Sequence, residues 1–133
     1  MIARCVELSW DIKRNPAGEK GPREPGWQNL KPNLEELERH LAQGGNVGVR
    51  LGASSGGLVD VDLDCAEALS LATTYLPPTN AVFGRASKPR SHYLYVAVGA
   101  AFAAYSDPLT GETIVELRAD GRTGGAHQTL IPP

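Results

Sequence analysis

The stretch Gly57-Leu58-Val59-Asp60-Val61-Asp62-Leu63-Asp64 alternates aliphatic side chains with carboxylates, as is typical of a β-strand. Successive side chains on a strand point to opposite faces, so the aliphatic residues would line one face and Asp60, Asp62 and Asp64 the other. Residues two apart on a strand are separated by about 6.5 Å, a span from which carboxylates can converge on one or two divalent cations. Like charges in a row destabilise a strand unless a positive charge neutralises them. We therefore expect a cation site; the alternative is an exposed edge strand, or a loop in which Asp64 caps a helix.

The composition is that of an ordinary globular domain of 133 residues, with 41% hydrophobic and 21% charged residues. A net charge of −2 argues against a generally basic surface of the kind that binds nucleic acid, so any site for a polyanion would be local. Cys5 and Cys65 have no metal-ligand spacing, which argues against a zinc knuckle or a disulfide framework. Because we find no signal peptide and no membrane-spanning stretch, we expect a cytoplasmic protein with no membrane partner. We expect residues 1–133 to be one domain cut from a longer chain, since the sequence stops at Pro132-Pro133 just after an apolar run.

Two helices are predicted from apolar periodicity and capping residues. The clearer one covers 33–44, where Asn33 is the N-cap and Glu36 completes a capping box. The other covers 64–76, where Asp64 is followed three residues later by a Glu in the same pattern, and Pro77-Pro78 ends it. Asp64 could therefore be a helix cap, a metal ligand or both.

Three segments rich in turn-forming residues separate these elements. Residues 11–32 are predicted to form a loop that is either simply solvated or a mobile basic flap over a polyanion. The basic residues of this loop are Lys13, Arg14, Lys20 and Arg23. The Gly/Ser turn 52–57 predicts a hairpin between the strands on either side and could also cradle a phosphate. Residues 99–111 are predicted to be a connection without a strand.

The remaining pattern predicts an α+β domain built on a mostly antiparallel sheet. The predicted strands cover 2–10, 47–51, 57–64, 81–84, 92–98, 113–118 and 127–131. In the strand 92–98, alternation places His92 on the face opposite Tyr93. A basic turn covers 85–90, and a Gly-rich turn covers 119–126.

Four groups of residues carry the chemistry of two-metal phosphoryl transfer. Carboxylates hold Mg²⁺ or Mn²⁺ through hard oxygens, the metals activate an attacking hydroxyl, and cationic side chains take up the charge of a triphosphate. Glu116 in an apolar strand could instead form a structural ion pair with Arg118, and a single His at a strand start is often only a surface residue. The four groups are Asp62 with Asp64, the basic turn containing Arg85, Lys88 and Arg90, the pair Ser91-His92, and Glu116 with Arg118.

The order and spacing of these motifs resemble the bifunctional primase–polymerase (Prim-Pol) domain of the archaeo-eukaryotic primase superfamily, over residues 5–133. The family is common on plasmids, phages and other mobile elements. The residues that carry the resemblance are Gly48 and Gly52, Ser55 to Val59, Asp62-Leu63-Asp64, Leu76 to Thr79, Phe83-Gly84-Arg85, Pro89 to Tyr95, Val115 to Gly121, and Leu130 to Pro133.

The resemblance implies an RRM-like sheet packed against a small α/β N-terminal unit. It implies that Asp62, Asp64 and Glu116 bind Mg²⁺ or Mn²⁺ and that His92 contacts the triphosphate. The nucleotide would also be bound by Arg85, Lys88, Arg90, Ser91 and Arg118. Asp60 stands where the family usually has an aliphatic residue, and its role is left open between a supporting position near a basic residue and simple exposure to solvent.

We therefore expect a DNA primase and DNA polymerase that transfers nucleotides from (d)NTPs to a 3′-hydroxyl on a single-stranded DNA template. A replicative helicase, fused or associated, would be a further partner. Two alternatives stay open on the residues alone: a nucleotide- or nucleic-acid-binding module without catalysis, and a metal-dependent nuclease that uses the same carboxylates.

Overall fold

The computed structural model describes residues 2–123 and 125–132, which form two antiparallel sheets and three α-helices. The smaller sheet has the strand order β1-β2-β8, from β1 (Ile12–Asn15), β2 (Asn46–Arg50) and β8 (Gln128–Ile131). The larger sheet has the order β4-β5-β3-β7-β6, from β4 (Val82–Arg85), β5 (Lys88–Val96), β3 (Leu58–Leu63), β7 (Thr113–Arg118) and β6 (Ala103–Ser106). The helices are α1 (Ile2–Glu7), α2 (Leu34–Ala42) and α3 (Ala66–Tyr75), with single 3-10 turns at Trp27–Asn29 and Ala53–Ser55. The predicted α+β class is confirmed.

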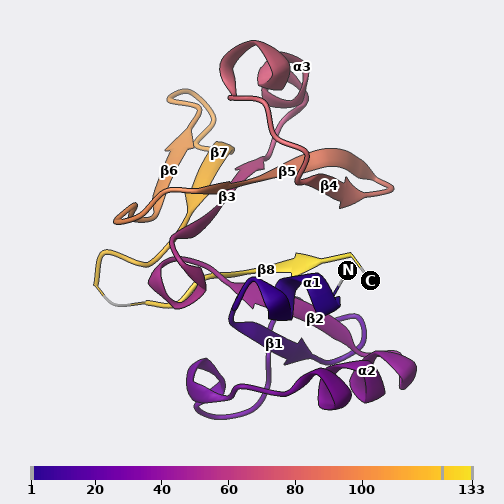
Figure 1. The fold of residues 1–133 in the computed structure, drawn as a ribbon. Coiled ribbons are helices and arrows are strands. Elements are labelled where there is room, and N and C mark those ends of the chain that lie inside the picture. Colours follow the sequence, from indigo (N-terminus) through magenta and orange to yellow (C-terminus); the bar gives the residue numbers. More distant parts are fainter. Residues whose placement is uncertain (1, 124, 133) are drawn as a thin grey trace.

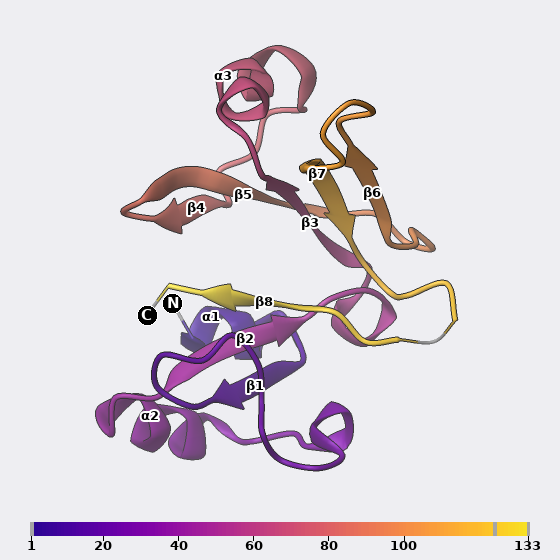
Figure 2. The ribbon, with the colours of Figure 1, turned by 180° about the vertical axis from the view of Figure 1, so that it is seen from behind.

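The two sheets lie one above the other, with α3 on the outer side of the larger sheet and α1 and α2 beside the smaller one (Figure 1). The view from behind shows the same order, with β8 between the larger sheet and the rest of the smaller half (Figure 2). Val61, Leu63 and Tyr93 pack together with residues of α3. The opposite face of β3, which carries the acids, therefore looks toward β8.

The main hydrophobic core lies in the smaller half and extends to the larger sheet. Its buried residues come from both helices of the smaller half and from both sheets. Leu58 on β3 and Leu94 on β5 belong to the same cluster and join the two halves. The other buried members are Ile2, Cys5, Ile12, Leu37, Val47, Val49, Leu51 and Ile131. Burial of these side chains stabilises the arrangement of the two sheets. This arrangement sets the position of the inner face of the larger sheet, which is the face that carries the acids of β3 and looks toward β8.

Helix α2 forms as its sequence predicts. The Asn33 side chain accepts a hydrogen bond from the Glu36 backbone N–H at 2.9 Å, and the Glu36 carboxylate accepts one from the Asn33 N–H at 2.9 Å. This capping box satisfies two donors that the first turn of a helix leaves free. The helix places Leu37 fully inside the core. Gly44, with φ +83°, follows its C-terminal end.

The prediction of a strand over 2–10 is wrong, because α1 occupies Ile2–Glu7. Ile2 and Cys5 are both buried, and their spacing of three residues is that of one helical face. Ser9, with φ +58°, and a hydrogen bond from Trp10 N–H to the Cys5 carbonyl then turn the chain. A short apolar run of this kind fits either a helix or a strand, and packing against the core decides it.

The prediction of a loop over 11–32 is wrong at its start, because β1 (Ile12–Asn15) pairs there with β2. Lys13 is buried rather than part of a basic flap: its ammonium lies 2.6 Å from Asp11 and donates to the carbonyls of Gln28 and Leu30. Two more of its basic residues, Arg14 and Arg23, are paired with Glu24 and Glu19. These cations therefore act mainly within the segment.

The predicted hairpin between 47–51 and 57–64 is also wrong. β2 pairs with β1 and β8, whereas β3 pairs with β5 and β7 in the other sheet. Between them, Gly52 adopts φ +82°, a side chain at its Cβ position would overlap the Asp120 carboxylate, and that carboxylate accepts a hydrogen bond from Ala53 N–H at 2.8 Å. The Asp120 carboxylate thus already occupies the N–H of Ala53, a group that a phosphate bound in this turn would use.

Two further predictions differ from the structure, and two segments named in the sequence lie partly outside the described residues. The connection 99–111 contains β6, an edge strand that pairs with β7. Helix α3 is capped by Cys65, whose sulfur accepts from Ala68 N–H at 3.4 Å, and not by Asp64. The predicted turn 119–126 includes residue 124, and the final Pro-Pro includes residue 133; both positions lie outside the described residues.

Candidate metal and nucleotide site

The residues predicted for the site lie mainly on three neighbouring strands of the larger sheet. β3 is central, and Asp62 stands opposite His92 on β5 and opposite Glu116 on β7. Asp60 stands opposite Arg118. Directly opposed residues of antiparallel strands have Cβ atoms about 4.5–5.5 Å apart, so the register brings these side chains together on the inner face.

Three carboxylates form a compact group at the end of β3. One oxygen each from Asp62, Asp64 and Glu116 lies within 4.8 Å of the other two. Oδ1 of Asp62 is buried without a hydrogen-bond partner among the described residues, whereas Asp64, just after the strand, is exposed. Hard oxygen donors that converge at a solvent-accessible strand end suit Mg²⁺ or Mn²⁺. These ions bind through a few carboxylates and keep several water or substrate oxygens as further ligands. The residues present therefore fit a divalent metal.

Two cationic side chains flank this group from opposite strands. Nζ of Lys88, on β5, lies 2.6 Å from Oδ1 of Asp64 and 4.0 Å from Oδ1 of Asp62. The guanidinium of Arg118, on β7, lies 3.7 Å from Asp62 and 3.8 Å from Glu116. Arg118 also donates to the carbonyl of Gln128 on β8 at 2.7 Å, which ties the site to the smaller sheet. These charges reduce the mutual repulsion of the carboxylates.

His92 is held on two sides. Its Nδ1 lies 2.9 Å from Oδ2 of Asp60 and 3.7 Å from Oδ1 of Asp62. Phe83, directly opposite on β4, stacks on the imidazole with ring centroids 5.0 Å apart and planes 15° apart. Burial lowers the pKa of His92, but the hydrogen bond and charge of Asp60, with the charge of Asp62, outweigh it and raise that pKa above 6.5.

The pKa of Asp62 is raised above 3.8. Burial of the carboxyl is the main cause, and the negative charges of Asp64 and Asp60 act in the same direction. His92 and Lys88 oppose the shift. A carboxylate whose charge is disfavoured by its surroundings gains from a cation, so the electrostatics agree with the donor geometry.

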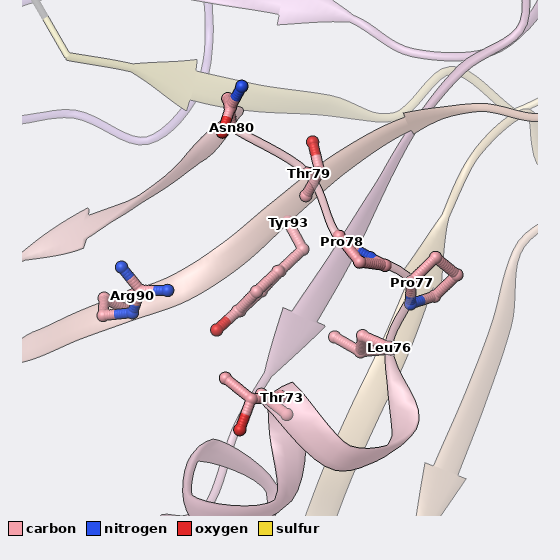
Figure 3. Close-up of a pocket in the computed structure, with 9 residues that line it drawn as sticks. Thr73, Leu76, Pro77, Pro78, Thr79, Asn80, Arg90 and Tyr93 are labelled. Carbon is pink, nitrogen blue, oxygen red and sulfur yellow. The ribbon is translucent and has the colours of Figure 1, made fainter.

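The other predicted nucleotide-binding residues are distributed around the β4–β5 hairpin. Arg85 is exposed opposite Lys88, and Ser91 is buried. Arg90, with φ +56°, interrupts the alternation of β5 and lines a groove of about 400 Å³ together with Tyr93, on the side of the sheet that α3 covers (Figure 3). Tyr93 and His92 point to opposite faces, so Arg90 lies with Tyr93 rather than with the carboxylates.

Two contacts of His92 in the site, with Asp60 and with Phe83, could not be assigned from the sequence. Asp60 is completely buried and hydrogen-bonded to His92, so of its two proposed roles, exposure to solvent is excluded. Phe83 lies in a predicted strand and among the residues that carry the family resemblance, but the sequence predicts no role for it in the site; its stacking on His92 follows from the β4–β5 register. The sequence signal that Asp60 belongs to the site is its spacing of two residues from Asp62, which places both side chains on the same face of the strand.

The structure is thus an α+β domain whose inner sheet face carries a carboxylate group suited to a divalent metal, with flanking cations. The family described as bifunctional DNA primase/polymerase, N-terminal (Prim-Pol) matches residues 2–133. The chain belongs to this family, as its motifs predicted. Prim-Pol proteins are generally nucleotidyltransferases that act on nucleotides and DNA with divalent metals. A comparison with curated proteins found no match. Among the described residues, no helix is long and apolar enough to cross a membrane.

Proposed function

We propose that the domain transfers nucleotidyl groups from (d)NTPs to a 3′-hydroxyl on a single-stranded DNA template, with Mg²⁺ or Mn²⁺ held by Asp62, Asp64 and Glu116. The observation that carries the proposal is the convergence of these three carboxylates beside His92 and two cations, in a chain of the Prim-Pol family. A bound divalent metal would supply charge neutralisation and lower the pKa of the attacking hydroxyl.

In this proposal the carboxylates bind the metal, and the cationic side chains contact the phosphates. In the transfer, the 3′-oxygen forms a bond to the α-phosphorus while the bond to the bridging oxygen of the pyrophosphate breaks, so negative charge increases on the leaving group. Lys88 and Arg118 lie beside the carboxylates, and their positive charges would stabilise the phosphate oxygens of the leaving group. His92, which lies on β5 four residues after Lys88, would supply a further polar contact to the triphosphate.

A primer-extension assay with labelled primer, single-stranded template, dNTPs and Mn²⁺ tests the proposal. Asp62→Asn, Asp64→Asn and Glu116→Gln should each lower kcat/KM at least about 100-fold, which corresponds to about 2.7 kcal/mol of transition-state stabilisation. Glu67→Gln removes an equal charge from the exposed first turn of α3 and serves as the matched control. Wild-type extension by an Asp62→Asn/Asp64→Asn double variant would overturn the site assignment.

The same preparation separates the alternative functions. Calorimetry with ATP and Mn²⁺ that shows binding, next to an assay that shows no incorporation, would indicate a non-catalytic module. Degradation of labelled DNA without any nucleotide would indicate a nuclease. Incorporation that requires both (d)NTP and template supports the proposed polymerase, and omission of the primer tests whether it can also begin a chain.

A further inference from the structure

Asp60 is the most completely buried acid in the site, with 0% of its surface exposed. It lies in the middle of β3, between buried Val59 and half-buried Val61. Its Oδ1 has no hydrogen-bond partner among the described residues. Burial of a carboxylate is strongly unfavourable unless charge and hydrogen bonds compensate, so a residue of this kind in a strand centre calls for a specific role.

The polar contacts of Asp60 point to His92. Oδ2 lies 2.9 Å from Nδ1 of His92, which is hydrogen-bond distance, but 4.0 Å from the guanidinium of Arg118. Arg118 instead donates to the Gln128 carbonyl and approaches Asp62 more closely than Asp60. Asp60 therefore acts chiefly on the imidazole and not as half of a structural pair with arginine.

The imidazole is constrained by two independent contacts. The Asp60 carboxylate, which can only accept, requires the proton of this hydrogen bond to sit on Nδ1. Stacking on Phe83 sets the plane of the ring. With the plane and one nitrogen defined, Nε2 is the nitrogen left for a substrate, because the described residues provide it with no hydrogen bond.

We propose that Asp60 is a positioning residue, which holds Nδ1 of His92 so that Nε2 faces the triphosphate of the incoming nucleotide. Phe83 assists by holding the ring plane. This inference rests on the proposed function for the role of His92, but the orientation of the ring can be measured without catalysis. The carboxylate orients the imidazole much as an outer carboxylate orients a ligating histidine, and removal of such a partner commonly costs about 10- to 100-fold.

Three variants separate positioning from folding. Asp60→Val replaces the acid with a residue that suits a buried strand, Asp60→Asn keeps an amide oxygen that can accept from Nδ1–H, and His92→Ala removes the ring. Thermal melting checks that each variant folds. In the extension assay, Asp60→Val should raise KM for the nucleotide about tenfold or more, with a smaller change in kcat, and Asp60→Asn should lose less.

A double-variant cycle gives the decisive comparison. If Asp60 acts through His92, adding Asp60→Val to His92→Ala should cause no further loss. Equal losses in both backgrounds, with normal melting, would overturn the proposal, because they would show an action independent of the ring. An unchanged KM in Asp60→Val would overturn it as well.

A spectroscopic measurement keeps the inference distinct from the proposed function. At a pH high enough to leave the ring neutral, nitrogen-15 NMR should show His92 protonated on Nδ1 in the wild type and should show loss of that preference in Asp60→Val. The resonance is assigned by its absence in His92→Ala. If the wild type incorporates no nucleotide, the proposed function fails while this result still decides whether Asp60 orients the ring. An unchanged tautomer in Asp60→Val would refute the positioning role.

Discussion

Nζ of Lys88 lies 2.6 Å from Oδ1 of Asp64, one of the three carboxylates that converge at the end of β3. The contact joins β5 to the segment between β3 and α3, and both side chains are partly open to solvent. The ammonium competes with a metal for the same oxygen, yet its positive charge is also well placed for a phosphate. Lys88 should therefore have opposite effects on the two ligands.

Lys88→Met tests these opposite effects. Without nucleotide, the variant should bind Mn²⁺ up to about fivefold more tightly, because a partly exposed ion pair is worth at most about 1 kcal/mol. With Mn²⁺ saturating, it should bind dATP more weakly. Calorimetry measures both affinities. Lys31→Met, which removes an equal charge from an exposed position, is the control. Parallel weakening of metal and nucleotide would show that Lys88 supports the shape of the site instead.

The raised pKa of His92 makes folding stability depend on pH. Because the folded pKa lies above 6.5, the stabilising contribution of the charged ring is fully present below pH 6.5 and is lost as pH rises through the folded pKa. Burial of the ring and the charge of Arg118 lower the pKa of His92, and the hydrogen bond and charge of Asp60, with the charge of Asp62, raise it above 6.5. NMR titration of the ring should give a midpoint above 6.5, and Asp60→Asn should lower it. A wild-type midpoint below 6.5 would contradict the interpretation.

The raised pKa of Asp62 should affect metal binding from the acid side. A carboxyl must lose its proton to bind a metal, so affinity for Mn²⁺ should begin to fall above the pH expected for an ordinary Asp. The linkage to folding has the opposite sign: the contribution of the protonated group to stability is present below pH 3.8 and is lost as pH rises through the raised pKa. Calorimetry from about pH 7 down to about pH 3 follows the affinity. Asp62→Asn should remove the contribution of this carboxyl to the acid limb, although Asp64 and Glu116 must still lose their protons to bind the metal. A wild-type limb centred at or below pH 3.8 would contradict the shift.

Two of the strands that form the site, β3 and β7, were predictable because each carries a strong period of two. The third, β5, begins at Lys88, inside the turn predicted over 85–90, because Arg90 with φ +56° interrupts its alternation. β3 and β7 lie where the alternation places them, and α2 lies where its capping residues place it. The convergence of Asp62 with Glu116 was expected only through the family resemblance, since the two are far apart in the chain. The register, in which they stand directly opposite, is a tertiary property.

The sheet partition was not predictable from local pattern. A turn rich in Gly and Ser suggested a hairpin, but β2 finds its partners in β1 and β8, one of which lies near the end of the chain. Pairing over such distances depends on which apolar faces can be buried together, and turn residues do not encode it. The role of Asp60 was hidden for the same reason: its partner His92 is across the β3–β5 pair.

Lys13 is the clearest case of a charge that misled the interpretation of its segment. In a run of Pro, Gly and basic residues it indicated an exposed flap, yet only 1% of the residue is exposed. Lysine is almost never fully buried unless it is paired. Asp11, two residues earlier and also buried, supplies the partner. Two backbone carbonyls, from Gln28 and Leu30, complete the coordination of the ammonium.

Lys13→Met should lower the free energy of unfolding by about 3–5 kcal/mol, because it leaves Asp11 buried with a more distant cation, Arg50, at 3.9 Å. Arg14→Met is the matched control: Arg14 is the next residue on the same strand, but its pair with Glu24 is partly exposed to solvent, so the loss should be about 1 kcal/mol or less. Urea unfolding followed by circular dichroism measures both. A double variant, Lys13→Met with Asp11→Leu, should recover much of the loss, since it removes the isolated charge as well. If Lys13→Met and Arg14→Met unfold at the same urea concentration, the buried pair does not stabilise the smaller sheet.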